Sequence, residues 1–314
     1  MDEFRDALDR CLRQIPRGRV ATCGGIARAL GDVRAARAVA SWLTEYPATR
    51  TGHRVVRADG RPVLPTASQR LVSERIPLRG DRVPANRFVP VRTPEGLLDR
   101  LRREQRDLSR AVTEKDEGGP ARRIAGVDVA YDDGRMYAAA VCVDASTLAV
   151  TEVATVARAV SFPYIPTYLA RREFPGIEAA TRRLSARPDV LMVDGHGRLH
   201  PALFGVACDA GVRLDIPTIG VAKHPLVGHA MKALGGDAAA IPVALGGVTR
   251  GYAWVPPGRG RPIFVSVGHR ISLATSLDLV RRTTRHRYPE PLVLADRASK
   301  EMKRNEKREK GARR

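Results

Sequence analysis

The first eighty residues place hydrophobic side chains at helical spacing. Phe4, Leu8 and Leu12 recur every four residues, which predicts an amphipathic helix at the start of the chain. The segments IARALG and RAARAVASWLTEY predict two further helices, the first ending at a glycine and the second just before a proline. Two short helices joined by a tight turn form either a helix-turn-helix or an ordinary core hairpin. The next segment, GHRVVRADGRPV, predicts a short strand or turn.

Further along the chain the pattern changes to alternating and continuous apolar runs. Residues 123–160 predict three antiparallel strands, with turns at 132–134 and 144–147. Helix-like EFPGIEAATRRLSA then precedes DVLMVDGHG, an apolar strand that runs into an aspartate and two glycines. IPTIGVAK and PIFVSVGHR predict more strands, and SLATSLDLVRRTT predicts another helix. Strands that alternate with helices after an antiparallel start predict an α/β domain with a mixed sheet.

These patterns divide the chain into four segments. Residues 1–83 predict a small helical domain, and residues 95–298 predict the α/β domain. Between them, 84–94 contains three prolines, which interrupt helix and sheet and indicate a linker. Residues 299–314 are basic and nearly free of apolar side chains, so they predict a disordered, solvated tail.

Composition narrows the classes of function. The chain has 314 residues and a net charge of +20, which suits two folded domains and a polyanionic partner, nucleic acid first. No apolar run is long enough to cross a membrane, and the acidic start MDEFRDALDR is unlike a signal peptide, so we expect no membrane partner. The 4 cysteines are far apart and form no CxxC pair, which argues against a zinc site or a disulfide framework and favours the cytoplasm.

Two carboxylates stand where the strand pattern predicts burial. Asp128 lies in IAGVDVAY and Asp194 in VLMVDGHG, and Glu173 comes at the start of a predicted helix. A carboxylate in an apolar strand is costly unless it is paired or binds a cation, so these residues suggest a shared Mg²⁺ or Mn²⁺. The alternative is that Asp128 pairs with Arg122 or Arg123, while Glu173 caps its helix and Asp194 ends a strand in an Asx-turn.

Five ordered segments in this half resemble the endonuclease V family: AGVDVAY, FPYIPTYLARREFP, VDGHGRLHP, IPTIGVAKHPLVG and VSVGHRISL. The resemblance covers roughly residues 95–298. It implies an RNase H-like fold and a Mg²⁺-dependent endonuclease, with Mn²⁺ as a substitute ion. It also implies nicking of DNA at the second phosphodiester 3′ of deaminated bases, principally deoxyinosine.

The same resemblance implies roles for individual residues. Asp128, Glu173 and Asp194 would be the metal-binding catalytic acids, Lys223 would place a positive charge at the scissile phosphate, and His200 would assist beside the metal. Asp296 falls where the family has a further polar group. Residues that would bind the DNA and the extruded base are the wedge residue Tyr164 together with Leu169, Gly195, Gly197 and Gly220.

The first half resembles the DNA-binding domain of O6-alkylguanine-DNA alkyltransferases, through IPRGRVATCGGIARALG, AARAVASWL and TGHRVVRADGRPV. The resemblance implies that residues 1–83 form a winged-helix-like DNA-binding domain. The family's reactive motif is Pro-Cys-His-Arg-Val, and here Gly52 replaces the acceptor cysteine. Alkyl transfer needs a thiolate, so this half resembles the alkyltransferase-like proteins, which bind lesions without repairing them. The resemblance implies that Arg37, His53 and Arg54 bind the DNA or the lesion. Cys23 and Tyr46 depart from the family pattern, which puts lesion flipping in question.

Together these observations predict a DNA repair endonuclease with a module that targets alkylated bases, acting on double- or single-stranded DNA. One alternative is a non-catalytic sensor that binds lesions and recruits other repair factors. Another is an inosine-specific ribonuclease. The complete set of acids argues against the first alternative, and the DNA-binding resemblance of the first half argues against the second.

Overall fold

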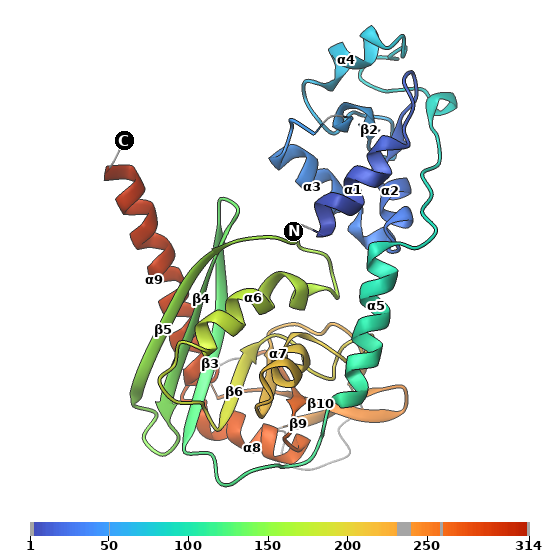
Figure 1. The fold of residues 1–314 in the computed structure, drawn as a ribbon. Coiled ribbons are helices and arrows are strands. Elements are labelled where there is room, and N and C mark those ends of the chain that lie inside the picture. The colour runs from blue at the N-terminus through green and yellow to red at the C-terminus, as the bar shows by residue number, and fades with distance from the viewer. Residues whose placement is uncertain (1–2, 50, 231–239, 258–259, 313–314) are drawn as a thin grey trace. The chain divides into compact units, whose positions relative to one another are not determined.

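The computed structural model describes residues 3–49, 51–230, 240–257 and 260–312. The chain separates into two compact units (Figure 1). The first comprises Met1–Glu104 with Ser161–Pro166, and the second comprises Gln105–Val160 with Thr167–Arg314. The boundary at Glu104 falls inside helix α5 (Leu97–Leu108).

The first unit is built from short helices around an apolar core. They are α1 (Glu3–Arg13), α2 (Cys23–Ala29), α3 (Ala36–Glu45) and α4 (Ala67–Ser73). Phe4, Leu8 and Leu12 are all buried, as their spacing predicts. The Thr22 hydroxyl accepts a hydrogen bond from the Gly25 amide and caps α2. A two-stranded parallel sheet, β1 (Ala21–Thr22) with β2 (Val55–Val56), completes a small helical domain of the predicted class.

The expected linker at 84–94 is part of the first unit and is not a separate connection. The Val20 amide donates to the Arg87 carbonyl, and the Val89 amide donates to the Val20 carbonyl, so this segment pairs with the body of the unit. Val91 is buried, and Phe88 and Val89 are partly buried. The prolines exclude a helix here but still allow an extended segment, whose apolar side chains pack inward.

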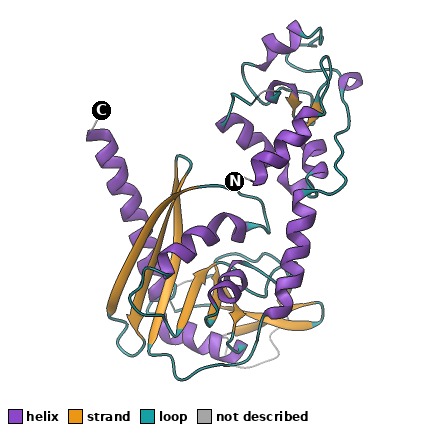
Figure 2. Ribbon diagram, in the orientation of Figure 1, coloured by secondary structure: helices purple, strands orange, loops and turns teal. Residues whose placement is uncertain are grey.

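The second unit is built on a nine-stranded mixed sheet (Figure 2). Its strand order is β5-β4-β3-β6-β7-β11-β10-β9-β8. The strands are β3 (Arg123–Asp132), β4 (Arg135–Asp144), β5 (Val150–Ala159), β6 (Val190–Asp194), β7 (Thr218–Ala222), β8 (His229–Ala230), β9 (Ala240–Leu245), β10 (Val248–Trp254) and β11 (Ile263–His269). In this sheet the neighbouring pairs β3–β6 and β6–β7 are parallel, and the other pairs of its described strands are antiparallel. The predicted meander and the predicted mixed sheet are therefore confirmed.

Helices cover both faces of this sheet (Figure 1). On one face, α6 (Leu169–Thr181) and α7 (Val206–Leu214) pack over a core that includes Val127 and Val193. On the other, α8 (Leu273–Thr283) and the start of α9 (Glu290–Ala312) pack over a core that includes Ile124 and Met192. Alternate residues of β3 and β6 thus contribute to opposite layers, as the two-residue period of a strand requires.

The expected disordered tail is instead the end of helix α9, which continues to Ala312. Residues 313–314 lie outside the described part of the chain. The prediction failed because the tail has little apolar surface of its own, whereas the helix packs along β3 and β4 and is held there by ion pairs such as Arg135–Glu306. Among the described residues, no helix is both long and apolar enough to cross a bilayer.

Candidate active site

Register places the two strand aspartates side by side. Strands β3 and β6 pair in parallel with Val127 opposite Val193, so the next residues, Asp128 and Asp194, stand at the same level on neighbouring strands. Strands of a sheet lie about 4.8 Å apart, and side chains at the same level point to the same face. Both carboxylates therefore lie together on the face that α9 covers.

The third acid reaches this edge from the opposite layer. Glu173 lies within α6, which begins at Leu169, four residues earlier than the sequence pattern indicated. The Tyr131 hydroxyl, at the end of β3, donates to Glu173 Oε1 at 3.1 Å. The Arg172 guanidinium lies 4.3 Å from the centre of the Tyr131 ring. Glu173 is therefore held by a specific partner inside the site and does not serve as a helix cap.

Asp194 accepts hydrogen bonds on both of its oxygens. Lys223 Nζ, just beyond β7, lies 2.5 Å from Oδ2, and the Tyr288 hydroxyl lies 3.0 Å from Oδ1. The same ammonium lies 4.8 Å from the centre of the Tyr288 ring. Tyr288 thus fixes the relative positions of the acid and the cation, and the Asx-turn alternative does not describe Asp194.

Asp128 contacts the start of α9. Ser299 Oγ donates to Asp128 Oδ2 at 3.2 Å, and Asp296 lies one turn earlier on the same helix. Asp296 is paired with Lys300 at 2.7 Å. The alternative pairing of Asp128 with Arg122 or Arg123 is wrong. Both arginines lie at or just before the start of β3, at least five residues before Asp128, and the Arg123 guanidinium donates to Glu152.

The pKa values of the acids show that negative charge in this cluster exceeds the nearby positive charge. Burial, then the negative charges of Asp194 and Asp296, raise the pKa of Asp128 to about 6, although Lys223 acts in the opposite direction. Burial, assisted by Asp128 and Asp194, raises the pKa of Glu173 to about 8, against the hydrogen bond from Tyr131. Perturbed carboxylates that share one cluster are typical of catalytic or cation-binding sites.

The donor set fits a hard divalent cation. Asp128, Asp194 and Glu173 offer only carboxylate oxygens. The charge of Asp194 raises the pKa of Asp128, and the charges of both aspartates raise the pKa of Glu173, so an added cation would relieve their repulsion. In the described part of the chain, however, no group of three His, Cys, Asp or Glu side chains is arranged closely enough to coordinate one metal ion. The Lys223 ammonium on Asp194 supplies part of the missing charge.

His200 is buried, and both of its ring nitrogens make hydrogen bonds to backbone groups. Its Nδ1 accepts from the Ala202 amide at 3.1 Å, so its Nε2 carries the proton and donates to the Thr167 carbonyl at 3.0 Å. Thr167 lies two residues before α6, and His200 lies in the loop after β6. The imidazole therefore ties together the two segments that present Glu173 and Asp194.

At the three predicted pocket glycines, neighbouring atoms leave no room for a Cβ. An added Cβ at Gly197 would lie 2.0 Å from the Val267 carbonyl oxygen, and one at Gly220 would lie 2.4 Å from the Gly197 amide nitrogen. At Gly195 it would lie 2.4 Å from Val206 Cγ1. These glycines are required because the loop after β6 packs directly onto β7 and β11, and this packing fixes the loop beside Asp194.

The predicted wedge residue is exposed. Tyr164 has 60% of its surface accessible, whereas its neighbours Phe162 and Ile165 are buried. An aromatic ring that projects from a buried, proline-flanked segment is free to stack on a base. Leu169 differs, because it packs against the core beneath α6 and supports the start of that helix.

In the first unit, the predicted lesion-binding segment is fixed by the carboxylate of Glu74, whose side chain is 10% exposed. Glu74 accepts from His53 Nε2 at 2.9 Å and from Arg54 Nη2 at 2.7 Å. Burial opposes ionisation of Glu74, but the hydrogen bonds from Arg54 and His53 outweigh it and lower its pKa to about 2. Arg54 also donates to the Ile15 carbonyl, so it holds this segment and does not extend towards solvent. Gly52 is buried, and Arg37 is exposed on α3.

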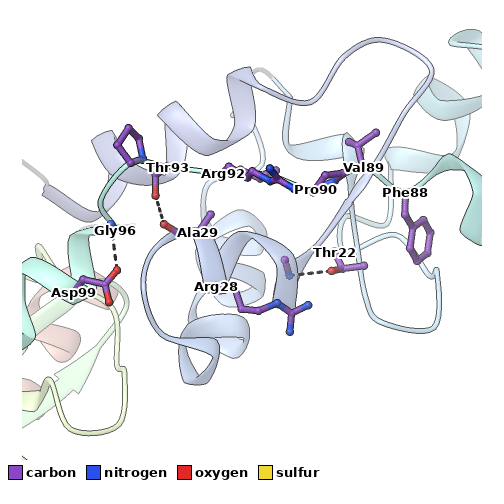
Figure 3. A pocket seen from close by; sticks show the side chains of 13 residues that line it. Thr22, Arg28, Ala29, Phe88, Val89, Pro90, Arg92, Thr93, Gly96 and Asp99 are labelled. Carbon is purple, nitrogen blue, oxygen red and sulfur yellow. Dashed lines mark hydrogen bonds between the residues drawn. The ribbon is translucent and has the colours of Figure 1, made fainter.

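A separate groove of about 590 Å³ lies beside α2 in the same unit (Figure 3). Thr22, Arg28, Phe88 and Asp99 contribute to its lining. Thr93 Oγ1 donates to the Ala29 carbonyl and fastens the extended segment to the helix. Arg37, Gly52, His53 and Arg54 do not line this groove, so it is distinct from the predicted lesion-binding segment.

Comparison with known proteins identifies both units. Residues 106–297 match the family model of endonuclease V, and residues 3–76 match that of the 6-O-methylguanine DNA methyltransferase DNA-binding domain. The chain belongs to the endonuclease V family. Endonuclease V of Thermofilum pendens is 46% identical over 65% of this chain and 88% of its own length. Endonuclease V of Rhodospirillum centenum is 42% identical over 68% of this chain and 90% of its own.

Solved structures agree on the fold of the second unit. Endonuclease V of Streptomyces avermitilis is 37% identical, with a TM-score of 0.62 over 67% of this chain and 94% of that one. Endonuclease V of Ciona intestinalis, solved with a 24mer DNA containing an inosine followed by a ribo-adenosine, is 26% identical. Its TM-score is 0.61 over 66% of this chain and 98% of that one. The protein is therefore a nuclease of the endonuclease V family, fused to a methyltransferase-type DNA-binding domain.

Sequence reasoning missed four supporting residues: Tyr131, Tyr288, Ser299 and Glu74. Tyr131 had a usable signal, because it lies three residues beyond Asp128 at the end of the same strand. Tyr288 and Ser299 had none, since each is more than 90 positions from the aspartate it contacts. Glu74 lies 20 residues beyond Arg54, and only the folded unit brings the two together.

Proposed function

We propose that this protein nicks DNA at the second phosphodiester 3′ of deoxyinosine in a Mg²⁺-dependent reaction, with Mn²⁺ as a substitute ion. The observation that carries the proposal is the placement of Asp128 and Asp194 at one level on parallel strands. The charges of both aspartates raise the pKa of Glu173, and the Lys223 ammonium lies beside Asp194. A bound divalent cation supplies the activation of water and the neutralisation of phosphate charge that such a reaction needs.

The chain's own residues divide the remaining work. Asp128, Asp194 and Glu173 would hold the cation, with Ser299, Tyr288 and Tyr131 fixing one acid each. The side chain of Lys223 is 43% exposed, so its ammonium is accessible to a phosphate and can stabilise the charge that develops there. His200 holds the loops that present the acids, and exposed Tyr164 would stack in the space left by an extruded base.

We further propose that the first unit binds DNA at alkylated bases without accepting the alkyl group. Gly52 offers no thiol, and the buried Cys23 has its pKa raised to about 11 by burial, which disfavours a thiolate substitute. Arg37 on the exposed side of α3 is available to DNA. Tethering to the nuclease would raise the effective concentration of the active site near such lesions.

Nicking by the full-length protein tests this proposal. Otherwise identical duplexes carry one inosine, one O6-methylguanine or neither, with a matched inosine-containing RNA strand to test the ribonuclease alternative. We expect Mg²⁺-dependent nicking of inosine DNA and none of the unmodified duplex. Preferential cleavage of the RNA would replace the DNA assignment, and the absence of any cleavage would favour the lesion-sensor alternative.

A further inference from the structure

The second half of α9 lies beyond the region that matches the endonuclease V family. The family match ends at residue 297, whereas the helix continues from there to Ala312. This extension carries six basic residues, Lys300, Lys303, Arg304, Lys307, Arg308 and Lys310. Its three acids are Glu301, Glu306 and Glu309. Apart from Ser299, which donates to Asp128, no residue of this extension has a role in the function proposed above.

Charges on the extension are separated by face. A groove of about 390 Å³ between α9 and β5 is lined on the helix side by Ala298, Glu301, Met302, Asn305, Glu306 and Glu309. All three acids therefore belong to the face that meets β5. At 3.6 residues per turn, the six basic residues fall on the opposite half of the helix. The result is a basic face and an acidic face on one helix.

The helix is held in place while part of its basic face stays available. Glu306 pairs with Arg135 of β4 at 3.0 Å, and Lys303 Nζ donates to the Tyr131 carbonyl of β3 at 3.5 Å. Arg304 and Arg308 are exposed, and neither has an ion-pair partner among the described residues. Lys307 is 76% exposed, with only a 3.9 Å contact to Asp132. We call Arg304, Lys307 and Arg308 the α9 stripe.

The half of α9 that carries the α9 stripe also carries Asp296 of the active site. Asp296, whose charge acts on Asp128, lies on the same half of the helix as Lys300 and Lys307, four and eleven residues before them. Between Asp296 and Lys310 the helix rises by about 21 Å at 1.5 Å per residue. Phosphates follow one another every 3.4 Å along the axis of one DNA strand. The basic face therefore matches a run of about six nucleotides that starts at the acid cluster.

We propose that the α9 stripe binds the phosphate backbone of substrate DNA on one side of the nicked bond. Charge complementarity and continuity with the acids select this partner, and the proposal rests on the nuclease function argued above. Three exposed cations that each neutralise a phosphate would release counterions and make binding more dependent on salt. The stripe would add affinity irrespective of base sequence, because phosphate contacts position a protein without reading bases.

Binding of the full-length protein to an inosine duplex, measured in EDTA across a salt series, tests the proposal without any nicking. The variant is Arg304→Gln, Lys307→Gln and Arg308→Gln combined. We expect its slope of log affinity against log salt to fall by about 2 to 3, close to 0.9 per lost phosphate contact. The matched control combines Arg187→Gln, Arg281→Gln and Arg282→Gln, which removes the same charge from exposed positions. Arg187 and Arg282 line a cavity with Asp189 and Pro217, residues that precede β6 and β7 at the edge opposite Asp194.

A second arm uses duplexes shortened on one side of the inosine. We expect shortening of one flank to abolish the difference between wild type and the stripe variant, and shortening of the other to leave it. An unchanged salt slope would overturn the proposal and favour an acidic protein partner for this face. Equal losses in the control variant would also overturn it, because they reflect net charge alone. Wild-type protein that fails to nick inosine DNA, yet shows the stripe-specific slope, would refute the nuclease function and leave the stripe standing.

Discussion

Replacing Asp128 by Asn should abolish nicking and yet stabilise the metal-free protein. Folding raises the pKa of Asp128 from 3.8 to about 6, through burial and through the charges of Asp194 and Asp296. A rise of roughly 2 pKa units corresponds to about 3 kcal/mol of unfavourable interaction in the ionised form. Asn has the same shape and can still accept from Ser299, so the substitution removes the charge and keeps the packing.

The pH dependence of this effect has a definite sign. Because folding raises the pKa of Asp128, ionisation of this residue destabilises the folded state. The destabilisation is complete above about pH 6, and it disappears as the pH falls to 3.8, the ordinary pKa of an aspartate. We therefore expect Asp128→Asn in EDTA to raise the melting temperature of the second unit by about 3–10 °C at pH 8. Near pH 4 the two proteins should melt almost together.

Differential scanning calorimetry in EDTA at both pH values measures this shift. Glu152→Gln is the matched control, because hydrogen bonds from Ser185 and Arg123 lower the pKa of Glu152, so its removal should destabilise the unit at pH 8. Millimolar Mn²⁺ should raise the melting temperature of wild type more than that of Asp128→Asn. A melting temperature of Asp128→Asn equal to or below wild type at pH 8 would refute the view that these acids repel one another.

Four further outcomes follow from the same contacts. Lys223→Met should slow single-turnover nicking about 10²-fold, and a rate within threefold of wild type would remove Lys223 from the chemistry. Glu74→Gln should destabilise the first unit by about 3 kcal/mol above pH 4.5, where Glu74 is ionised in the wild-type protein. This difference in stability should vanish towards pH 2, and melting curves recorded across this pH range measure it. Gly197→Ala should lower the melting temperature of the second unit and slow nicking, since its Cβ would lie 2.0 Å from the Val267 carbonyl oxygen, whereas Gly119→Ala, with open space, should do neither. Duplex carrying radiolabelled O6-methylguanine should leave no label on the protein, because Gly52 offers no acceptor, and labelled protein would show that another thiol substitutes.

Much of the active site could be anticipated because its main acids stand in apolar strands. Buried carboxylates conflict with their surroundings, and that conflict is visible in the sequence at Asp128 and Asp194. Their supporting partners could not be found this way. Tyr288 and Ser299 are an ordinary tyrosine and serine in helical or loop segments, and only the fold of α9 against β3 and β6 brings them to the acids.

The predictions for two segments were wrong for the same physical reason. The proline-rich stretch at 84–94 and the charged stretch at 299–312 both look unable to form a core of their own. Each segment is held in place by contacts with residues from other parts of the chain. Val89 pairs with Val20, and Glu306 is held by Arg135. Local composition reports what a segment can bury by itself, whereas these segments pack against a body that is already formed.

Strand nicking by wild type and Asp128→Asn on one inosine duplex tests the central claim most directly. We expect Mg²⁺-dependent cleavage at a single position, the second phosphodiester 3′ of inosine, by wild type alone. Cleavage should stop in EDTA and be absent from the unmodified duplex. Equal cleavage by Asp128→Asn, or cleavage that ignores the inosine, would contradict the assignment of the acid cluster as the catalytic centre.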